Sequence, residues 1–292
     1  MSNAKGYIRW YAKKAARKSV ALGSWSAGSL HGDDEAASTT RVRVLTYHRF
    51  GGDGYDPFCV DTAAFEEQMR LLAESGLAIT IDDLDAFLAG ELDLADGSVL
   101  VTIDDGFRSA YSEALPILRC FDIPGIIYVP PGCMDGPVSG EVDPEARLSW
   151  RELGELARAG IAVGSHAWSH RSLGTMCPDE VRVEAHRSRY ELENRVTESV
   201  TSFAYPFGTR ADYTDVTAEI LRDSGYTTAF TSQHGAVTLD ADPIELPRVK
   251  VEGGEGLWMF RLLIRGGLDA WQWVDRTLWR LQANDDGAAT TG

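Results

Sequence analysis

Short apolar runs alternate along the chain with segments in which apolar residues recur every three or four positions. The first pattern is typical of buried strands and the second of amphipathic helices. The expected strands cover residues 42–47, 77–80, 99–104, 125–129, 161–164, 202–205, 226–230 and 244–251. The expected helices cover residues 62–75, 81–89, 109–121, 150–159, 178–196 and 213–224. This alternation predicts a parallel α/β fold, and eight strands favour a closed barrel over a doubly wound sheet.

The two ends of the chain differ from this α/β body. Residues 1–40 hold a basic segment and then a stretch rich in Gly and Ser, which predicts a linker. The body covers residues 41–256. Residues 257–282 form a last amphipathic pattern, for which we expect one helix, and residues 283–292 are expected to be disordered.

The net charge excludes one broad class of partner. The chain of 292 residues has 28 Lys and Arg against 44 Asp and Glu, a formal net charge of −16. A protein that binds the nucleic acid backbone needs a basic face, so we expect no nucleic acid partner. The four cysteines form no C-x-x-C pair, which favours reduced thiols. With no apolar run of membrane-spanning length and no secretory signal, we expect a cytoplasmic protein.

Residues 1–20 carry six cations and no acid, which are Lys5, Arg9, Lys13, Lys14, Arg17 and Lys18. This segment is expected to contact anionic lipid at the membrane periphery or to bind a partner helix. The Trp and Arg residues of 257–282 allow a membrane interface too, but packing on the barrel is the favoured interpretation.

Two histidines stand four residues apart after the strand expected at 161–164, in Gly164-Ser-His166-Ala-Trp-Ser-His170. Histidines at this spacing can bind one metal ion when the segment coils by one turn. On its own, such a pair is more often a surface or core feature.

Two carboxylates, Asp104 and Asp105, directly follow an apolar strand. Carboxylates are costly in such surroundings unless they are solvated, paired or bound to metal. A helix N-cap would account for one of them but not for both. At the carboxyl end of a strand they lie where barrels place active sites. Two imidazoles and one carboxylate would hold a metal with an open position for water, and the second carboxylate would be a general base.

A third segment, residues 202–208, ends in Ala204-Tyr-Pro206-Phe-Gly208. Pro and Gly favour a rigid turn there, which can direct a backbone N–H at a developing oxyanion. An ordinary strand exit would explain the same residues.

Together the three segments resemble the polysaccharide deacetylase family (NodB-homology domain, carbohydrate esterase family 4). Thr-Ile-Asp-Asp-Gly at 102–106 is similar to its T-F-D-D-G motif, and His166 and His170 to its H-x-x-x-H motif. Residues 204–208 resemble its R-x-P-Y-G motif in a variant form. The resemblance extends from Arg41 to Val251. Tyr-His-Arg at 47–49 and Phe-Ala-Tyr-Pro-Phe-Gly at 203–208 are similar to a bacterial branch of the family.

The resemblance implies a distorted (β/α) barrel of seven or eight parallel strands, with residues 41–256 as the catalytic domain. It implies hydrolysis of acetyl groups on N-acetylated sugars, as in polysaccharide biosynthesis, with Zn²⁺ or another divalent metal such as Co²⁺, Ni²⁺ or Mn²⁺. By position, Asp104 would be the base, and Asp105, His166 and His170 would hold the metal. The backbone N–H of Phe207 would stabilise the oxyanion.

The chain departs from the family in two places. Ala204 stands where the family has an Arg that orients the catalytic Asp, and no His matches the late general acid. We expect Arg248 to replace that Arg and His48, at the end of the first strand, to be the acid, with His234 as the alternative. These departures leave open a second function, a non-catalytic glycan-binding protein. The residues expected to contact sugar are Tyr205, Pro206, Trp168 and Asp56, together with Asp53, Tyr55 and Arg171.

Overall fold

The computed structural model of the chain describes residues 14–15, 17–21, 23, 40–52, 56–134, 146–196, 199–269, 271–272 and 275. The tail expected at 283–292 and most of the predicted linker lie outside these residues, as do Asp53 and Tyr55.

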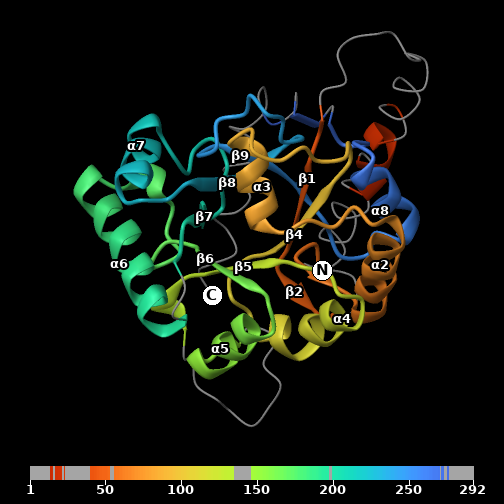
Figure 1. The fold of residues 1–292 in the computed structure, drawn as a ribbon, viewed down its shortest axis with the longest axis horizontal. Coiled ribbons are helices and arrows are strands. Elements are labelled where there is room, and N and C mark those ends of the chain that lie inside the picture. Colours follow the sequence, from red (N-terminus) through yellow and green to blue (C-terminus); the bar gives the residue numbers. More distant parts are fainter. Residues whose placement is uncertain are drawn as a thin grey trace, which may run out of the picture.

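Seven parallel strands form a closed barrel in the order β1-β4-β5-β6-β7-β8-β9 (Figure 1). Strand β1 closes the barrel because Thr46 pairs with Thr102 of β4 on one side and with Lys250 of β9 on the other. The bounds are β1 Arg43–Tyr47, β4 Val99–Ile103, β5 Ile126–Val129, β6 Ala162–Ser165, β7 Ser202–Ala204, β8 Thr228–His234 and β9 Leu246–Lys250. The prediction of a parallel (β/α) barrel is confirmed.

The strand expected at 77–80 is wrong. Only an isolated bridge joins Ala78 to Val99, because Thr80 already caps the next helix. The Thr80 side chain accepts from the backbone N–H of Asp83, and the Asp83 side chain accepts from the backbone N–H of Thr80. This capping box starts the helix at Ile81. A separate pair of short parallel strands, β2 Arg49–Phe50 and β3 Cys59–Val60, was not expected.

The helices pack around the outside of the barrel, except for α3, which lies across one end of it (Figure 1). Their bounds are α2 Thr62–Ser75, α3 Ile81–Leu88, α4 Leu115–Cys120, α5 Trp150–Arg158, α6 Pro178–Val196, α7 Asp215–Asp223 and α8 Leu257–Ile264, with short turns η1 Ala110–Ala114, η2 Pro131–Cys133 and η3 Leu173–Thr175. The expected helices at 62–75 and 178–196 match α2 and α6 at both ends.

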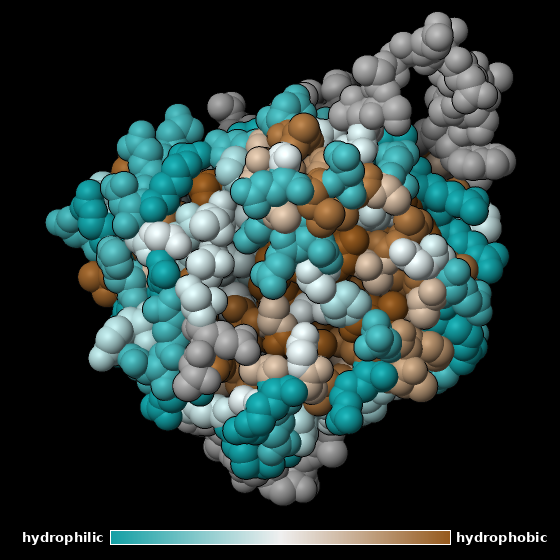
Figure 2. All heavy atoms as spheres, viewed as in Figure 1, coloured by the Kyte–Doolittle hydropathy of each residue, from teal (hydrophilic) through white to brown (hydrophobic). Residues whose placement is uncertain are grey.

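Alternate residues of the strands bury their side chains in two separate apolar clusters. Val44, Leu100 and Phe230 belong to the smaller cluster, which fills the barrel, and Leu84 and Phe87 of α3 join it. Helix α3 therefore covers the amino ends of the strands and leaves the carboxyl ends for the site. Figure 2 shows the face on which α3 lies as a mainly hydrophilic surface with apolar residues exposed between polar ones.

The single helix expected over 257–282 is wrong, because α8 ends at Ile264. Gly266 has a φ of +82°, and the N–H groups of Gly266 and Gly267 donate to the carbonyls of Leu263 and Leu262. These bonds form a Schellman termination, which a left-handed glycine permits. Within α8, Phe260 and Leu263 are buried, which agrees with packing on the barrel.

Part of the basic N-terminal segment packs against the barrel. Lys14 Nζ lies 2.8 Å from Glu252 Oε2, and Arg17 Nε lies 2.8 Å from Glu255 Oε1. All four side chains are buried, and Ala21 joins the larger apolar cluster. Residue 21 is thus core rather than the start of a linker, and two of the six cations of residues 1–20 are paired inside the protein.

Candidate metal centre and catalytic site

The two aspartates lie at the carboxyl end of β4. Thr102 and Asp104 share the inward face of the strand, while Asp105 leaves the strand with a φ of +70° and Gly106 follows with a φ of +64°. A Cβ at Gly106 would lie 2.9 Å from Val129 Cγ1, so only glycine fits this turn. The turn directs the two carboxylates to different partners.

Residues 166–170, called here the histidine loop, follow β6. His166 Nδ1 lies 2.7 Å from the carbonyl oxygen of Ala204. A carbonyl can only accept, so Nδ1 holds the proton and Nε2 keeps a free lone pair. Ala167 and His170 have φ values of +58° and +55°, which bend the loop back on itself.

The bend brings His166 and His170 to Asp105. Asp105 Oδ1 lies 3.3 Å from His166 Nε2 and 2.8 Å from His170 Nε2. One ligand atom from each residue lies within 4.8 Å of the others, the only such group in the part of the chain that the structure describes. Burial alone would raise the pKa of Asp105, but its contacts with His166 and His170 outweigh burial and hold the pKa well below its usual value. An ionised carboxylate with two imidazoles is the donor set of a three-ligand zinc site.

Asp104 does not join this group and pairs with Arg248 of β9 instead. Arg248 Nη1 lies 2.8 Å from Asp104 Oδ1, and Nη2 lies 2.7 Å from Oδ2. Arg248 Nε donates to the carbonyl of Thr231, which fixes the guanidinium. Burial would raise the pKa of Asp104, but the charge of Arg248 outweighs it and the pKa is lowered. The structure thus keeps Asp104 ionised beside Asp105 and the two histidines.

His48 lies just beyond β1, half-buried, with its ring 5.1 Å from that of Phe58. Its Nδ1 atom is buried and has no hydrogen-bond partner among the described residues. Burial has the largest effect on the pKa of His48 and lowers it, and the positive charges of Lys250 and Arg248 lower it further. Asp105 and Asp104 act in the opposite direction, but the pKa still falls to about 4. The imidazole is therefore neutral at pH 7.

The alternative acid, His234, has Asp275 as its partner. Its Nδ1 and its backbone N–H both bond Asp275, at 2.9 and 2.7 Å. His234 is not one of the residues that converge with Asp105.

Phe207 lies beside His170, with the ring centroids 5.1 Å apart, and is 39% exposed. Its φ of +61° turns the backbone sharply before Gly208. No acceptor among the described residues bonds the Phe207 N–H. This donor is therefore available at the site.

Tyr205 and Pro206, which were expected to contact sugar, are both buried. The Tyr205 hydroxyl donates to the carbonyl of Ile244, and its ring stacks on that of Tyr213. The strand that ends at Ala204 places Tyr205 in the apolar cluster outside the barrel.

Trp168 and Asp56 both have polar partners already. Arg187 lies over the Trp168 ring, 3.7 Å from its centroid. Asp56 accepts from Arg49 and from the Phe58 N–H. Their contacts with sugar stay predictions.

Three residues near the site were not singled out in the sequence. Phe58 is 38% exposed, Arg147 donates to the carbonyl of Asp105, and Glu184 bonds the histidine loop. No periodicity marks Phe58. Arg147 lies between the expected elements, and no pattern marks it either.

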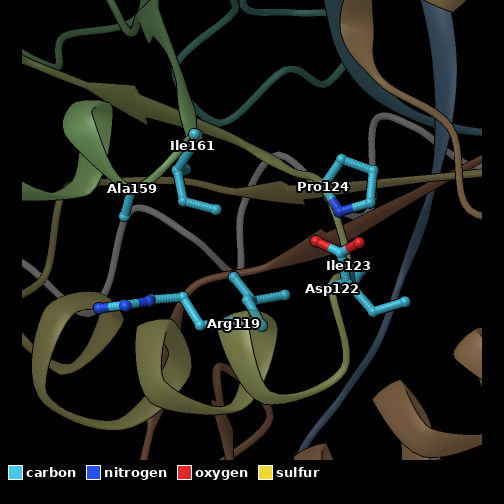
Figure 3. Close-up of a pocket in the computed structure, with 8 residues that line it drawn as sticks. Arg119, Asp122, Ile123, Pro124, Ala159 and Ile161 are labelled. Carbon is cyan, nitrogen blue, oxygen red and sulfur yellow. The ribbon is translucent and has the colours of Figure 1, made fainter.

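A pocket of about 430 Å³ lies at the other end of the barrel (Figure 3). Arg119, Asp122 and Pro124 line it, before β5 begins, and Ile161 lines it before β6. It therefore lies away from Asp105 and the histidine loop, which follow the carboxyl ends of the strands.

The chain matches the family model for polysaccharide deacetylase over residues 92–229, from just before β4 into β8. The Bacillus subtilis protein YxkH, which carries the family's name, is 24% identical over 215 residues, covering 73% of this chain and 72% of the relative. The poly-beta-1,6-N-acetyl-D-glucosamine N-deacetylase of Escherichia coli is 26% identical over 259 residues, covering 74% of this chain. This chain spans only 37% of the length of that relative.

The fold is similar to that of a Streptococcus pyogenes deacetylase, PplD, solved in complex with acetate. The TM-score is 0.68 at 20% identity, and the match covers 78% of this chain and 98% of that one.

Proposed function

Because the chain belongs to the polysaccharide deacetylase family, we propose that it is a metal-dependent hydrolase that removes acetyl groups from N-acetylated sugars. One observation supports this most. Asp105, His166 and His170 converge on one point, while Asp104 stands beside them as a carboxylate held by Arg248.

The donor set fits Zn²⁺, or Co²⁺, Ni²⁺ or Mn²⁺, held by Asp105, His166 and His170. Such an ion would polarise the acetyl carbonyl and lower the pKa of a water from ~15.7 to about 7. The bond from His166 Nδ1 to the Ala204 carbonyl supports this assignment, because metal-binding histidines donate from their other ring nitrogen.

The chain's own residues would complete the hydrolysis. Asp104 takes the proton of the attacking water, and the free N–H of Phe207 donates to the oxyanion. The carbon–nitrogen bond then breaks, and the nitrogen takes a proton to leave as the sugar amine, with acetate as the other product. His48 is the proposed donor of that proton. Its pKa of about 4 leaves His48 neutral at rest, so it must first receive a proton. The proton that Asp104 takes from the attacking water is the source, and its transfer through His48 to the nitrogen returns Asp104 to a carboxylate.

The exposed rings of Phe58 and Phe207 stand on two sides of the site, beside His48 and His170 respectively. Aromatic faces suit the C–H faces of sugars, and Trp168 and Asp56 are proposed as further contacts. The substrate is a glycan, a lipid-linked sugar or a sugar-containing small molecule. An oligomer of β-1,6-linked N-acetylglucosamine is the first to test, given the E. coli relative.

The experiment is acetate release from a panel of N-acetylated sugars by protein loaded with Zn²⁺ or Co²⁺. Release that depends on the metal supports the proposal. Metal-loaded protein that releases no acetate from any of them would leave glycan binding without catalysis as the function.

We also propose that residues 1–20 contact a membrane surface or partner helix in the cytoplasm. Lys14 and Arg17 are paired internally, whereas Lys18 is exposed and Lys5, Arg9 and Lys13 lie outside the described residues. No helix in the described part of the chain is both long and apolar enough to cross a bilayer. Loss of sedimentation with anionic liposomes on deleting residues 1–20 would support lipid contact.

A further inference from the structure

Glu184 lies on α6, outside the barrel, yet its carboxylate is bonded to the histidine loop. Its Oε2 atom accepts from the backbone N–H groups of Trp168 and Ser169, both at 2.8 Å. Its Oε1 atom accepts from the Ser169 hydroxyl at 2.7 Å. Glu184 is 7% exposed, so these bonds are shielded from water.

No cation in the described part of the chain pairs with Glu184. A buried carboxylate is costly unless hydrogen bonds replace its hydration. Here the two adjacent N–H groups and the hydroxyl do so, and all three come from the histidine loop. The loop conformation and the buried charge therefore stabilise each other.

The loop needs such support because its backbone is strained. Ala167 and His170, on either side of Trp168 and Ser169, both have positive φ values. Non-glycine residues persist in this region of backbone conformation only where the surrounding structure fixes them. On the barrel side, the Gly132 N–H donates to the Trp168 carbonyl, and the Cys133 thiol makes a long contact of 3.9 Å with the Ser169 carbonyl. Glu184 supplies the bonds on the other side.

We propose that Glu184 is a positioning residue for the metal site. It touches neither metal nor substrate, and it places His166 and His170 against Asp105 by fixing the two residues between them. The inference rests on the metal site of the proposed deacetylase. It means that a residue of α6, a helix outside the barrel, fixes the positions of the two histidines.

The test is Zn²⁺ affinity of the metal-free full chain, measured against a chromophoric chelator at a temperature where circular dichroism shows each variant folded. Glu184→Ala should weaken Zn²⁺ binding about 10–100-fold, as loss of a group that orients metal ligands does. Glu184→Gln should restore most of it, because its carbonyl can accept both N–H groups and its amide can donate to the Ser169 hydroxyl. If Glu184→Ala does not fold, Ser169→Ala, which removes one of the three donors, should show a smaller loss.

Two variants of the same helix are the controls. Ser188→Ala removes a 2.7 Å bond from α6 to Ser165 of β6 without touching the loop, and Glu191→Ala removes an exposed pair with Arg195. Both should bind Zn²⁺ like the wild type. Equal affinity of Glu184→Ala and wild type, or an equal loss in Ser188→Ala, would overturn the inference. A wild-type protein that binds no Zn²⁺ would overturn the metal-dependent function itself and this inference with it.

Discussion

His166 Nδ1 donates to the backbone carbonyl oxygen of Ala204 across 2.7 Å, and this bond directs His166 Nε2 toward Asp105. The bond joins the ends of β6 and β7, so it depends on the barrel rather than on the identity of a side chain. Any residue at position 204 offers the same carbonyl.

Removing a ligand should therefore have a different result from removing the base. We expect His166→Ala and Asp105→Ala to lose bound metal, measured by elemental analysis after dialysis. Asp104→Asn should keep its metal and lose about 10²–10⁴-fold in the rate of acetate release. An Asp104→Asn protein without metal would show that Asp104 is a ligand instead.

Arg248→Lys keeps a positive charge but cannot form the two parallel bonds to Asp104. We expect kcat to fall about 10²-fold with metal content unchanged, because the base loses its orientation. Arg222→Lys, in an exposed pair with Asp242, is the matched control and should behave as wild type. Unchanged kcat in Arg248→Lys would contradict an orienting role.

His48→Ala should lower kcat about 10²–10⁴-fold while the protein still binds metal, because the leaving nitrogen loses its proton donor. The control is His186→Ala, on the outer helix α6, where the ring contacts the Ser224 hydroxyl. If the rate of His48→Ala matches that of the control, His48 is not the acid.

Asp85 of α3 predicts a pH effect on stability that is independent of the site. Burial has the largest effect on the pKa of Asp85, and together with the negative charge of Asp82 it raises that pKa to about 6. The Oδ1 atom of Asp85 has no hydrogen-bond partner among the described residues. A carboxyl group whose pKa is higher in the folded than in the unfolded protein stabilises the fold at pH values below the unfolded pKa of about 3.9. This contribution to stability is lost as the pH rises through the folded pKa of about 6. Asp85→Asn should thus be more stable than wild type at pH 8 by about 1 kcal/mol, since partial exposure screens the effect. Urea unfolding at pH 4.5 and 8 measures this, and an equal difference at both pH values would refute it.

Arg17→Met should lower the free energy of unfolding by about 3–5 kcal/mol, because Glu255 stays buried without its main partner. The double variant Arg17→Met/Glu255→Leu should regain most of this, since the pair of Lys14 and Glu252 remains. Arg70→Met, in an exposed pair with Glu66, should cost at most about 0.5 kcal/mol. Urea unfolding of the four proteins checks the prediction, and a stable single variant would contradict it.

The barrel was predictable because each strand is a short apolar run between helical segments. The errors arose where local chemistry overrode this periodicity. The apolar residues 77–79 pair with β4 through a single bridge only, and Gly266 ends a helix within an amphipathic stretch. The hydrophobic pattern shows neither the missing pairing nor the helix end.

The convergence of Asp105 with His166 and His170 could be expected from the motifs, because carboxyl ends of parallel strands meet at one end of a barrel. The contact of Glu184 with the histidine loop could not be expected, because the sequence of a highly charged helix does not show which of its glutamates is buried. The burial of Tyr205 could not be expected either, because its place inside a motif says nothing about which face of the strand its side chain occupies.

The pairing of Arg248 with Asp104 has a consequence for how such a site can evolve. The strands of a barrel end around one centre, so a guanidinium from more than one strand can reach the same carboxylate. Once the pair is formed from β9, the side chain at position 204 can drift among residues that fit the barrel, because only its carbonyl is needed.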